Sequence, residues 1–213
     1  MKKIVVMLIA AVWLFGASAS QIVSDAYYVL RDFTHLKESK IPAKLLREAK
    51  AIVVVPGLLR GAFIVGGRYG EGVLLVRCGS GWSDPVFVKV AGGSLGWQIG
   101  IESIDLVLVF RSRESVRKLL GGKFTLGVDG SVAVGPVGRT GSAATDIELH
   151  SEIYSYSRSR GAFAGVSLSG VALSIDEART RSYYHAAPRS VLSCQVRKGS
   201  SAVHRLVELL GRF

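Results

Sequence analysis

The sequence lacks any apolar stretch long enough to cross a bilayer, which requires about 20 consecutive apolar residues. The run from Ile4 to Phe15 is too short, and the run from Ala51 to Leu59 is interrupted by Pro56. The segment from Leu106 to Phe110 has only the length of a strand. We therefore expect no membrane-spanning helix and a soluble mature protein.

The N-terminal end has the features of a secretory signal peptide. Lys2 and Lys3 precede the apolar run, and the small residues Ala17-Ser18-Ala19 follow it. This order is typical of a cleavable leader. We expect cleavage after Ala19, which leaves a single domain over residues 20–213 in the periplasm or outside the cell. A retained N-terminal anchor is the alternative, although no Cys lies near the cleavage site to accept a lipid.

The sequence also lacks a block of consecutive basic residues, which marks nucleic-acid-binding arms. Nucleic acid is in any case a poor partner for an exported protein. Basic residues are nevertheless in excess: loss of the leader leaves 25 of the 27 Lys and Arg residues against 16 Asp and Glu residues, a net charge of about +9. Such a charge favours acidic partners, namely phospholipid headgroups, acidic polymers or acidic proteins.

Cysteine is scarce, with Cys78 and Cys194 as the only two. An oxidising compartment outside the cytosol allows a disulfide to persist. The sequence spacing does not reveal whether the two Cα atoms come within about 7 Å, which a disulfide requires. A disulfide and two separate thiols both stay open.

Evidence for an active site is weak. Gly92-Gly93-Ser94-Leu95-Gly96 matches the nucleophile elbow of serine hydrolases and follows a predicted strand. An elbow opens a helix, however, whereas Trp97 to Ile101 continues as a strand with glycines that disfavour helix. A bent, glycine-containing strand is the better interpretation, and we expect no enzyme activity.

Metal and phosphate motifs are similarly incomplete. Glu148, His150 and Glu152 share one side of a strand, but their spacing of about 7 Å is too wide for one ion. A solvated polar strand face is the better interpretation. Gly67 to Gly72 and Gly121-Gly122-Lys123 resemble phosphate-binding loops without matching the P-loop or dinucleotide pattern. We interpret both as turns and expect neither a metal nor a cofactor.

From Ala51 onward, β-branched runs alternate with glycine-rich turns, which predicts strands. Glycine inside strands marks bulges, bends or close backbone approach, so we expect a strongly bent, barrel-like antiparallel sheet. The predicted strands are Ile52 to Val55, Gly61 to Arg68, Gly72 to Arg77, Pro85 to Val90, Trp97 to Ile101, Ile104 to Phe110, Ser131 to Val137, Ile147 to Arg158 and Phe163 to Ile175.

Helices are predicted at both ends of the chain, where the spacing of apolar residues is helical, and at three places between. Together with the sheet, these helices predict an α+β domain with helices at its N-terminal and C-terminal ends. The second helix begins with Pro42 in its first turn, and Asp176 caps the fourth. The predicted helices are Ser20 to Lys37, Pro42 to Lys50, Arg113 to Leu120, Asp176 to Tyr183 and Ser201 to Leu210.

Six segments in order resemble the SYLF domain family: Ala49 to Ile52, Gly66 to Arg68, Gly92 to Gly100, Asp105 to Val109, Gly135 to Arg139 and Tyr154 to Gly161. The resemblance implies a non-catalytic lipid-binding domain. Eukaryotic members bind phosphoinositides and in some cases actin filaments, and bacterial members are exported. For an exported chain, the implied function is peripheral binding of anionic phospholipid at a membrane surface in the bacterial envelope. The alternative is an exported structural or envelope-stress protein that contacts another, unknown protein.

The resemblance also implies where lipid is bound, because the family's membrane contact is attributed to an N-terminal amphipathic helix and nearby basic residues. The helix face predicted to enter the membrane interface carries Ile22, Val29, Phe33 and Leu36, and the alternative is that this face packs on the sheet. The predicted lipid-binding cations are Lys37, Lys40, Lys44, Arg47 and Lys50, with Arg158 and Arg160 as a second basic group.

Overall fold

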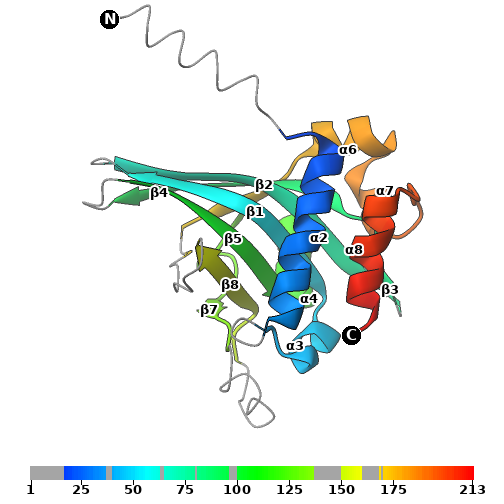
Figure 1. Cartoon of the computed structure of the whole chain (residues 1–213), viewed down its shortest axis with the longest axis horizontal. Coiled ribbons are helices and arrows are strands. Elements are labelled where there is room, and N and C mark those ends of the chain that lie inside the picture. The colour runs from blue at the N-terminus through cyan, green and yellow to red at the C-terminus, as the bar shows by residue number, and fades with distance from the viewer. Residues whose placement is uncertain are drawn as a thin grey trace, which may run out of the picture.

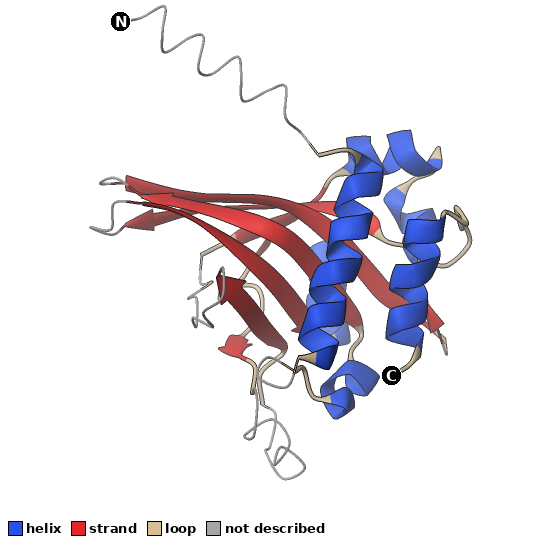
Figure 2. Ribbon diagram, viewed as in Figure 1, coloured by secondary structure: helices blue, strands red, loops and turns tan. Residues whose placement is uncertain are grey.

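A computed structural model describes residues 17–36, 40–62, 65–79, 81–95, 100–136, 150–159, 168 and 170–213. A single strongly curled sheet is combined with helices near both ends of the chain (Figure 1, Figure 2). The fold is therefore α+β with a half-barrel sheet, which confirms the predicted fold class.

The sheet has the strand order β6-β9-β4-β2-β1-β5-β8-β7, with β3 paired to the end of β2. All pairs of neighbouring strands are antiparallel except β7 and β8, which run parallel. The strands are β1 (Ala51–Ala62), β2 (Val65–Cys78), β3 (Gly81–Trp82), β4 (Val86–Leu95), β5 (Gly100–Phe110), β6 (Phe124–Thr125), β7 (Val132–Val134), β8 (Ile153–Ser159) and β9 (Ala172–Ile175).

The predicted turn between two strands is absent from β2. We expected Gly61 to Arg68 and Gly72 to Arg77 as two strands separated by a turn. Instead, Gly61 and Ala62 end β1, and β2 runs without interruption from Val65 through Gly70 and Gly72. A Cβ atom on Gly72 would collide with the carbonyl oxygen of Val54 on β1. The glycine therefore permits close approach of two neighbouring strands rather than a turn.

A bulge in β1 contributes to the bend of the sheet. The register of β1 shifts against β5 between Val55 and Leu58, around Pro56 and Gly57. Gly57 has a φ of +60°, which favours glycine. Its backbone N–H donates to Oδ1 of Asp105 on β5 at 3.1 Å, which fixes the irregular segment.

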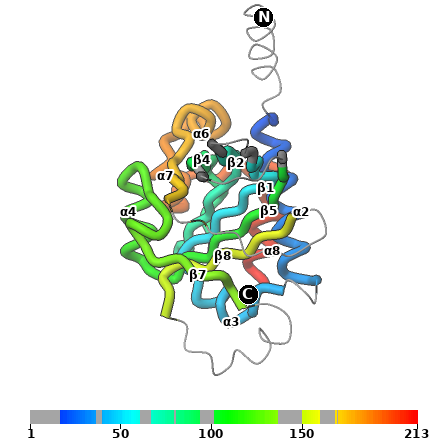
Figure 3. Tube along the Cα trace, turned by 90° about the vertical axis from the view of Figure 1, so that its left-hand side faces the viewer, coloured from blue at the N-terminus to red at the C-terminus, as the bar shows by residue number. Residues whose placement is uncertain are grey.

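The helices lie on both sides of the sheet. α2 (Ala19–His35) and α8 (Ser201–Gly211) lie side by side across one side (Figure 1), and α4 (Arg113–Leu120) lies on the other (Figure 3). The remaining helices are α3 (Ala43–Glu48), α6 (Glu177–Tyr184) and α7 (Pro188–Leu192).

The observed helix bounds agree closely with the predicted ones. Asp176 caps α6 as expected, because its side chain accepts a hydrogen bond from the backbone N–H of Arg179. Pro42 is the N-cap of α3 rather than a first-turn residue. The short helix α7 was not predicted.

The N-terminal end of α2 coincides with the expected cleavage point. Ser18 caps the helix, and its hydroxyl accepts a hydrogen bond from the backbone N–H of Gln21 at 3.1 Å. Cleavage after Ala19 would therefore remove the cap. The expected leader before Ala17 lies outside the described residues. Within the described part of the chain, no helix combines the length and the apolar character needed to span a bilayer.

The structure joins the two cysteines. Cys78 and Cys194 form a disulfide with their Cα atoms 6.4 Å apart, which selects the first of the two alternatives left open by the sequence. The bond attaches the end of β2 to the segment between α7 and α8. Nearby, Lys198 donates its backbone N–H to Oδ2 of the buried Asp84 at 2.7 Å. The C-terminal segment is thus fixed to the sheet by covalent and polar contacts.

Candidate functional site

The short helix α3 separates apolar from basic side chains. Its residues Leu45 and Leu46 are completely buried, whereas Lys44 and Arg47 are exposed. We call the cations Lys40, Lys44, Arg47 and Lys50 the α3 basic surface; Lys40 is exposed and Lys50 is half-buried. Lys37, which was predicted to belong to this group, lies outside the described residues.

The acidic residue of α3 is compensated from within the fold. Glu48 accepts a hydrogen bond from Nη2 of Arg111, which follows β5, at 2.9 Å. The charge of Glu48 is therefore balanced by Arg111, so that it subtracts little from the positive charge of the α3 basic surface. Arg111 could not be identified from the sequence, because 63 positions separate it from Glu48 and no local pattern connects them.

The predicted insertion of the α2 apolar face is wrong for three of its four residues. Ile22, Val29 and Phe33 are only 4%, 7% and 1% exposed, because this face covers the apolar surface that β1, β2 and β5 present. Side chains that form the core are unavailable to a membrane. Leu36 differs from them: it is 46% exposed and follows directly after the helix.

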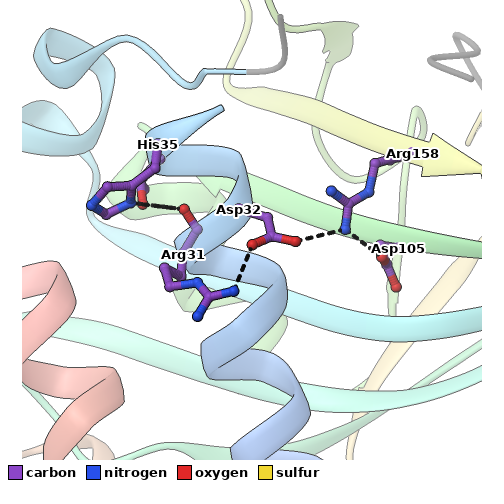
Figure 4. Close-up of polar contacts among 6 residues, drawn as sticks. Arg31, Asp32, His35, Asp105 and Arg158 are labelled. Carbon is purple, nitrogen blue, oxygen red and sulfur yellow. Dashed lines mark hydrogen bonds and ion pairs between the residues drawn. The ribbon is translucent and has the colours of Figure 1, made fainter. Parts of the chain in front are cut away.

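Arg158 was predicted to bind lipid, but the structure places it in an ion-pair network (Figure 4). Its Nη2 atom lies 3.1 Å from Oδ2 of Asp32 on α2 and 3.1 Å from Oδ2 of Asp105 on β5. Arg31 also contacts Asp32, at 3.1 Å. Burial of Arg158 lowers its pKa, but the hydrogen bonds to Asp105 and Asp32 outweigh this effect and raise it.

The surroundings of Arg158 are acidic rather than basic. A groove of about 350 Å³ beside it is lined by Asp25, Asp32 and Asp105. Asp25 thus adds a third carboxylate to the two that Arg158 contacts. The structure shows Arg158 paired with carboxylates of the fold, its contact with lipid stays a prediction, and Arg160 lies outside the described residues.

The Ser94 motif has the wrong context for a nucleophile elbow. β4 continues through Ser94 to Leu95, and Ser94 pairs with Gly66 of β2. A serine nucleophile would need a strand that ends in a sharp turn to a helix at this position. Gly96, the last residue of the motif, and Trp97, which begins the next predicted strand, lie outside the described residues.

Glu152, one of the three residues considered as metal ligands, binds a backbone N–H group. Its Oε2 atom accepts a hydrogen bond from the N–H of Ser131 at 3.1 Å. Across the segments that the structure describes, no three His, Cys, Asp or Glu side chains gather in a way that could hold a metal ion. His150 is exposed, and Glu148 lies outside these segments.

Comparison with known proteins gives a consistent family. The family model described as "Ysc84: Las17-binding protein actin regulator" matches residues 91–213. The SH3 domain-containing YSC84-like protein 1 of Rattus norvegicus is 35% identical over 163 residues, which are 73% of this chain and 48% of that protein.

Two proteins of Saccharomyces cerevisiae are also similar. Protein YSC84 is 36% identical over 148 residues, which are 68% of this chain and 31% of that protein. LAS seventeen-binding protein 3 is 33% identical over 163 residues, which are 74% of this chain and 35% of that protein. The chain therefore spans about half the length of its vertebrate relatives and about a third of the yeast proteins. The names of these relatives describe binding and regulatory proteins rather than enzymes.

Proposed function

The chain belongs to the Ysc84 (SYLF) family, and from this premise we propose that it binds anionic phospholipid at a membrane surface without catalysing a reaction. The observation that carries this proposal is the orientation of α3. This helix buries Leu45 and Leu46 and presents Lys44 and Arg47 to solvent, while Arg111 balances its only carboxylate. The α3 basic surface is thus the contact that we assign to lipid.

The charge of this surface accounts for weak and reversible attachment. Each Lys or Arg near an anionic membrane contributes about 1 kcal/mol, so the cations of the α3 basic surface together supply about 4 kcal/mol before screening. This corresponds to a dissociation constant of about 1 mM. Transfer of the half-exposed Leu36 into the interface would add about 1 kcal/mol. Since salt screens such charges over about 8 Å, the binding should be strongly salt-dependent.

We place this binding in the bacterial envelope, in the periplasm or outside the cell. Two features support this assignment. The Lys2-Lys3 pair and the apolar run that follows it are typical of an export signal. The disulfide between Cys78 and Cys194 suits an oxidising compartment.

Vesicle flotation tests the proposal. The protein should float with phosphatidylglycerol vesicles at low salt and stay at the bottom of the gradient with phosphatidylcholine vesicles. Salt at about 0.5 M should release it from the anionic vesicles, because the screening length is then only a few ångströms. Equal flotation with both lipids, or flotation that salt does not affect, would contradict an electrostatic attachment.

A protein partner is the second candidate, because the name of LAS seventeen-binding protein 3 describes a relative that binds a protein. In that case the chain would act as a structural or envelope-stress protein through contacts between proteins. Absence of flotation with every anionic lipid, together with a reproducible cross-linked species in intact cells, would favour this function over lipid binding.

A further inference from the structure

Two large apolar side chains are exposed where the sheet extends beyond α2. Leu59 of β1 and Tyr69 of β2 are partners in the strand register and are 51% and 49% exposed. Both lie near the ends of β1 and β2 that project past the helix (Figure 1). Because directly opposite residues of neighbouring antiparallel strands share a face of the sheet, the two side chains form one exposed apolar pair.

The apolar pair lies on the same face of the sheet as the acidic groove. Leu59 is the register partner of Ser103 on β5, and Ser103 is two positions from Asp105, so all three side chains point to one face. Asp105 contacts Arg158, which connects this face to α2. A Cβ atom on Gly57, which lines the groove, would lie 3.4 Å from Oγ of Ser103. The groove and the apolar pair are therefore neighbours.

The carboxylates of the groove exceed the cations that contact them. Asp32 and Asp105 share Arg158, and Arg31 also contacts Asp32. Asp25 is half-buried and accepts a hydrogen bond at 2.7 Å from a side-chain amide one turn earlier on α2, rather than from a cation. Asp25 therefore offers its negative charge to a cation from outside the fold.

A third exposed apolar group, Tyr28, lines the groove itself and is 44% exposed. This acidic and apolar area is called the α2–β1 surface below, and its residues are Asp25, Tyr28, Leu59, Tyr69 and Asp105. It differs in charge from the rest of a chain whose net charge is +11. Carboxylates repel anionic headgroups and attract cations, so the surface favours a basic protein partner over an anionic membrane.

The α3 basic surface has the complementary character. Its exposed cations are Lys40, Lys44 and Arg47. The exposed apolar residue Leu36 is close to them, because the backbone N–H of Ile41 donates to the carbonyl oxygen of Phe33 at 2.8 Å and holds this segment against the end of α2. The lining of the acidic groove contains no residue of α3. The two complementary surfaces are thus separate on one molecule and meet only between molecules.

We propose that the α2–β1 surface binds the α3 basic surface of a second copy of this chain. The contact removes Leu59 and Tyr69 from water and places α3 cations opposite Asp25. The net charge of the whole chain opposes this only weakly, because charges separated by more than about 8 Å are screened at physiological ionic strength, whereas charges in contact still attract. The contact joins two different surfaces, so each pair of copies keeps one unused surface of each kind and further copies can add.

The α3 cations would then take part in two contacts that exclude each other. A copy whose α3 surface is held by its neighbour cannot present the same cations to a membrane. Addition of phosphatidylglycerol vesicles should therefore separate associated copies. This competition rests on the proposed function, whereas the contact between copies does not.

Sedimentation velocity of the purified protein at about 0.15 M salt, a physiological ionic strength, tests the contact. The sedimentation coefficient of the wild type should rise with protein concentration. Asp25→Asn/Leu59→Thr should weaken the association by about tenfold or more, since a lost charge contact changes affinity by up to about fivefold and a lost apolar contact by roughly tenfold. The matched control Glu114→Gln/Val128→Thr changes one exposed acidic and one exposed apolar residue elsewhere and should associate like the wild type.

A mixture of two variants tests which surfaces meet. Asp25→Asn/Leu59→Thr keeps the α3 cations, and Lys40→Gln/Lys44→Gln/Arg47→Gln keeps the α2–β1 surface. Each variant alone should sediment as a monomer at concentrations where the wild type associates. An equimolar mixture should form dimers and nothing larger, because one intact surface of each kind remains. Restored association would also show that both variants are folded.

A wild type that stays monomeric at every concentration would overturn the proposal, as would an equal loss of association in the control. A mixture that stays monomeric, or an α3 variant that associates like the wild type, would exclude the α3 surface as the occupant. A monomeric wild type together with weaker vesicle flotation of Asp25→Asn/Leu59→Thr would assign the α2–β1 surface to the membrane instead. Failure of the proposed function is seen separately, as unchanged flotation when the α3 cations are removed.

Discussion

Arg158 connects three elements that are distant in the sequence. It belongs to β8, and its guanidinium contacts Asp32 on α2 and Asp105 on β5 at positions 126 and 53 residues away. Its side chain is 20% exposed, so these contacts are partly shielded from water. Asp105 in turn fixes the bulge at Gly57. Arg158 therefore links α2 and β8 to the part of the sheet that Asp105 fixes.

We expect Arg158→Gln to lower the free energy of unfolding by about 2 kcal/mol, because hydrogen bonds to charged groups contribute roughly that much and two carboxylates lose their cation. Urea unfolding measures the loss, and vesicle flotation of the folded variant should be unchanged. Arg117→Gln removes an exposed pair with Glu114 and should leave the urea midpoint where it is. Wild-type stability combined with weaker flotation would return Arg158 to the lipid site.

Asp176 gives the fold a specific response to acid. Burial raises its pKa, but the hydrogen bonds from Nζ of Lys89 and from the backbone N–H of Arg179 outweigh burial, so the pKa lies below its ordinary value of 3.8. A depressed pKa means that the ionised carboxylate stabilises the folded state. This contribution is complete above the ordinary value and is lost as the pH falls through the lower pKa of the folded state.

Asp176→Asn should isolate this charge, because Asn is an equally good N-cap for α6. We expect the variant to be less stable than the wild type by about 1 kcal/mol near pH 7, as for other partly exposed ion pairs. The difference should diminish as the pH falls below 3.8. Urea unfolding at a series of pH values measures it, and a difference that is constant down to pH 2, far below any ordinary carboxylate pKa, would show that the charge is irrelevant.

At the level of elements, α2 contributes a structural face, and the exposed residue Leu36 follows its last turn. Phe33 is in the core, whereas Leu36 precedes the α3 basic surface in the sequence. Phe33→Ser should therefore destabilise the fold by at least about 3 kcal/mol. Leu36→Ser should keep the melting temperature and weaken vesicle flotation. A stable Phe33→Ser protein that fails to float would show instead that the helix face inserts into the membrane.

The disulfide determines how firmly the C-terminal segment and α8 are held. Cys78 and Cys194 are 116 positions apart, and loss of a native disulfide typically costs 2–5 kcal/mol. We expect Cys78→Ser/Cys194→Ser to unfold at correspondingly lower urea concentration. Thiol labelling of wild-type protein under denaturing, non-reducing conditions should give no labelled cysteine, and two labelled sites per chain would refute the bond.

Helices and strands could be predicted where nearby residues mark their ends. They could not be predicted where a residue's role depends on a neighbouring strand. α4 was predicted with its observed bounds because Gly121-Gly122 signals its end, and the structure adds Ser112 as the N-cap. β2 was divided in two because Gly70 and Gly72 read as a turn. Their actual role is to let β1 approach, and the partner strand cannot be known from the glycines themselves.

For the whole molecule, the distribution of charge matters more than its total. The net charge of +11 is a property of the sequence, but it does not reveal that Asp25, Asp32 and Asp105 line the groove beside Arg158. Nor does it reveal that Lys123, Arg181 and Arg189 line another groove, between the end of α4 and helices α6 and α7. Lys44 and Arg47 were identified from the family resemblance, which implies a contact by basic residues near the first helix, and α3 presents both to solvent. Arg111 could not be identified in that way, because its contact with Glu48 joins positions 63 residues apart.

The most direct test of lipid binding compares two triple variants that lose the same charge from exposed positions on a short helix or just before it. They are Lys40→Gln/Lys44→Gln/Arg47→Gln at α3 and Arg113→Gln/Arg117→Gln/Lys118→Gln on α4. Both are floated with phosphatidylglycerol vesicles at low salt, after circular dichroism has shown that each is folded. At about 1 kcal/mol per cation before screening, the α3 variant should lose on the order of tenfold or more in vesicle affinity, whereas the α4 variant should float like the wild type. Flotation of the α3 variant equal to that of the wild type, or an equal loss in both variants, would contradict the assignment of lipid binding to the α3 basic surface.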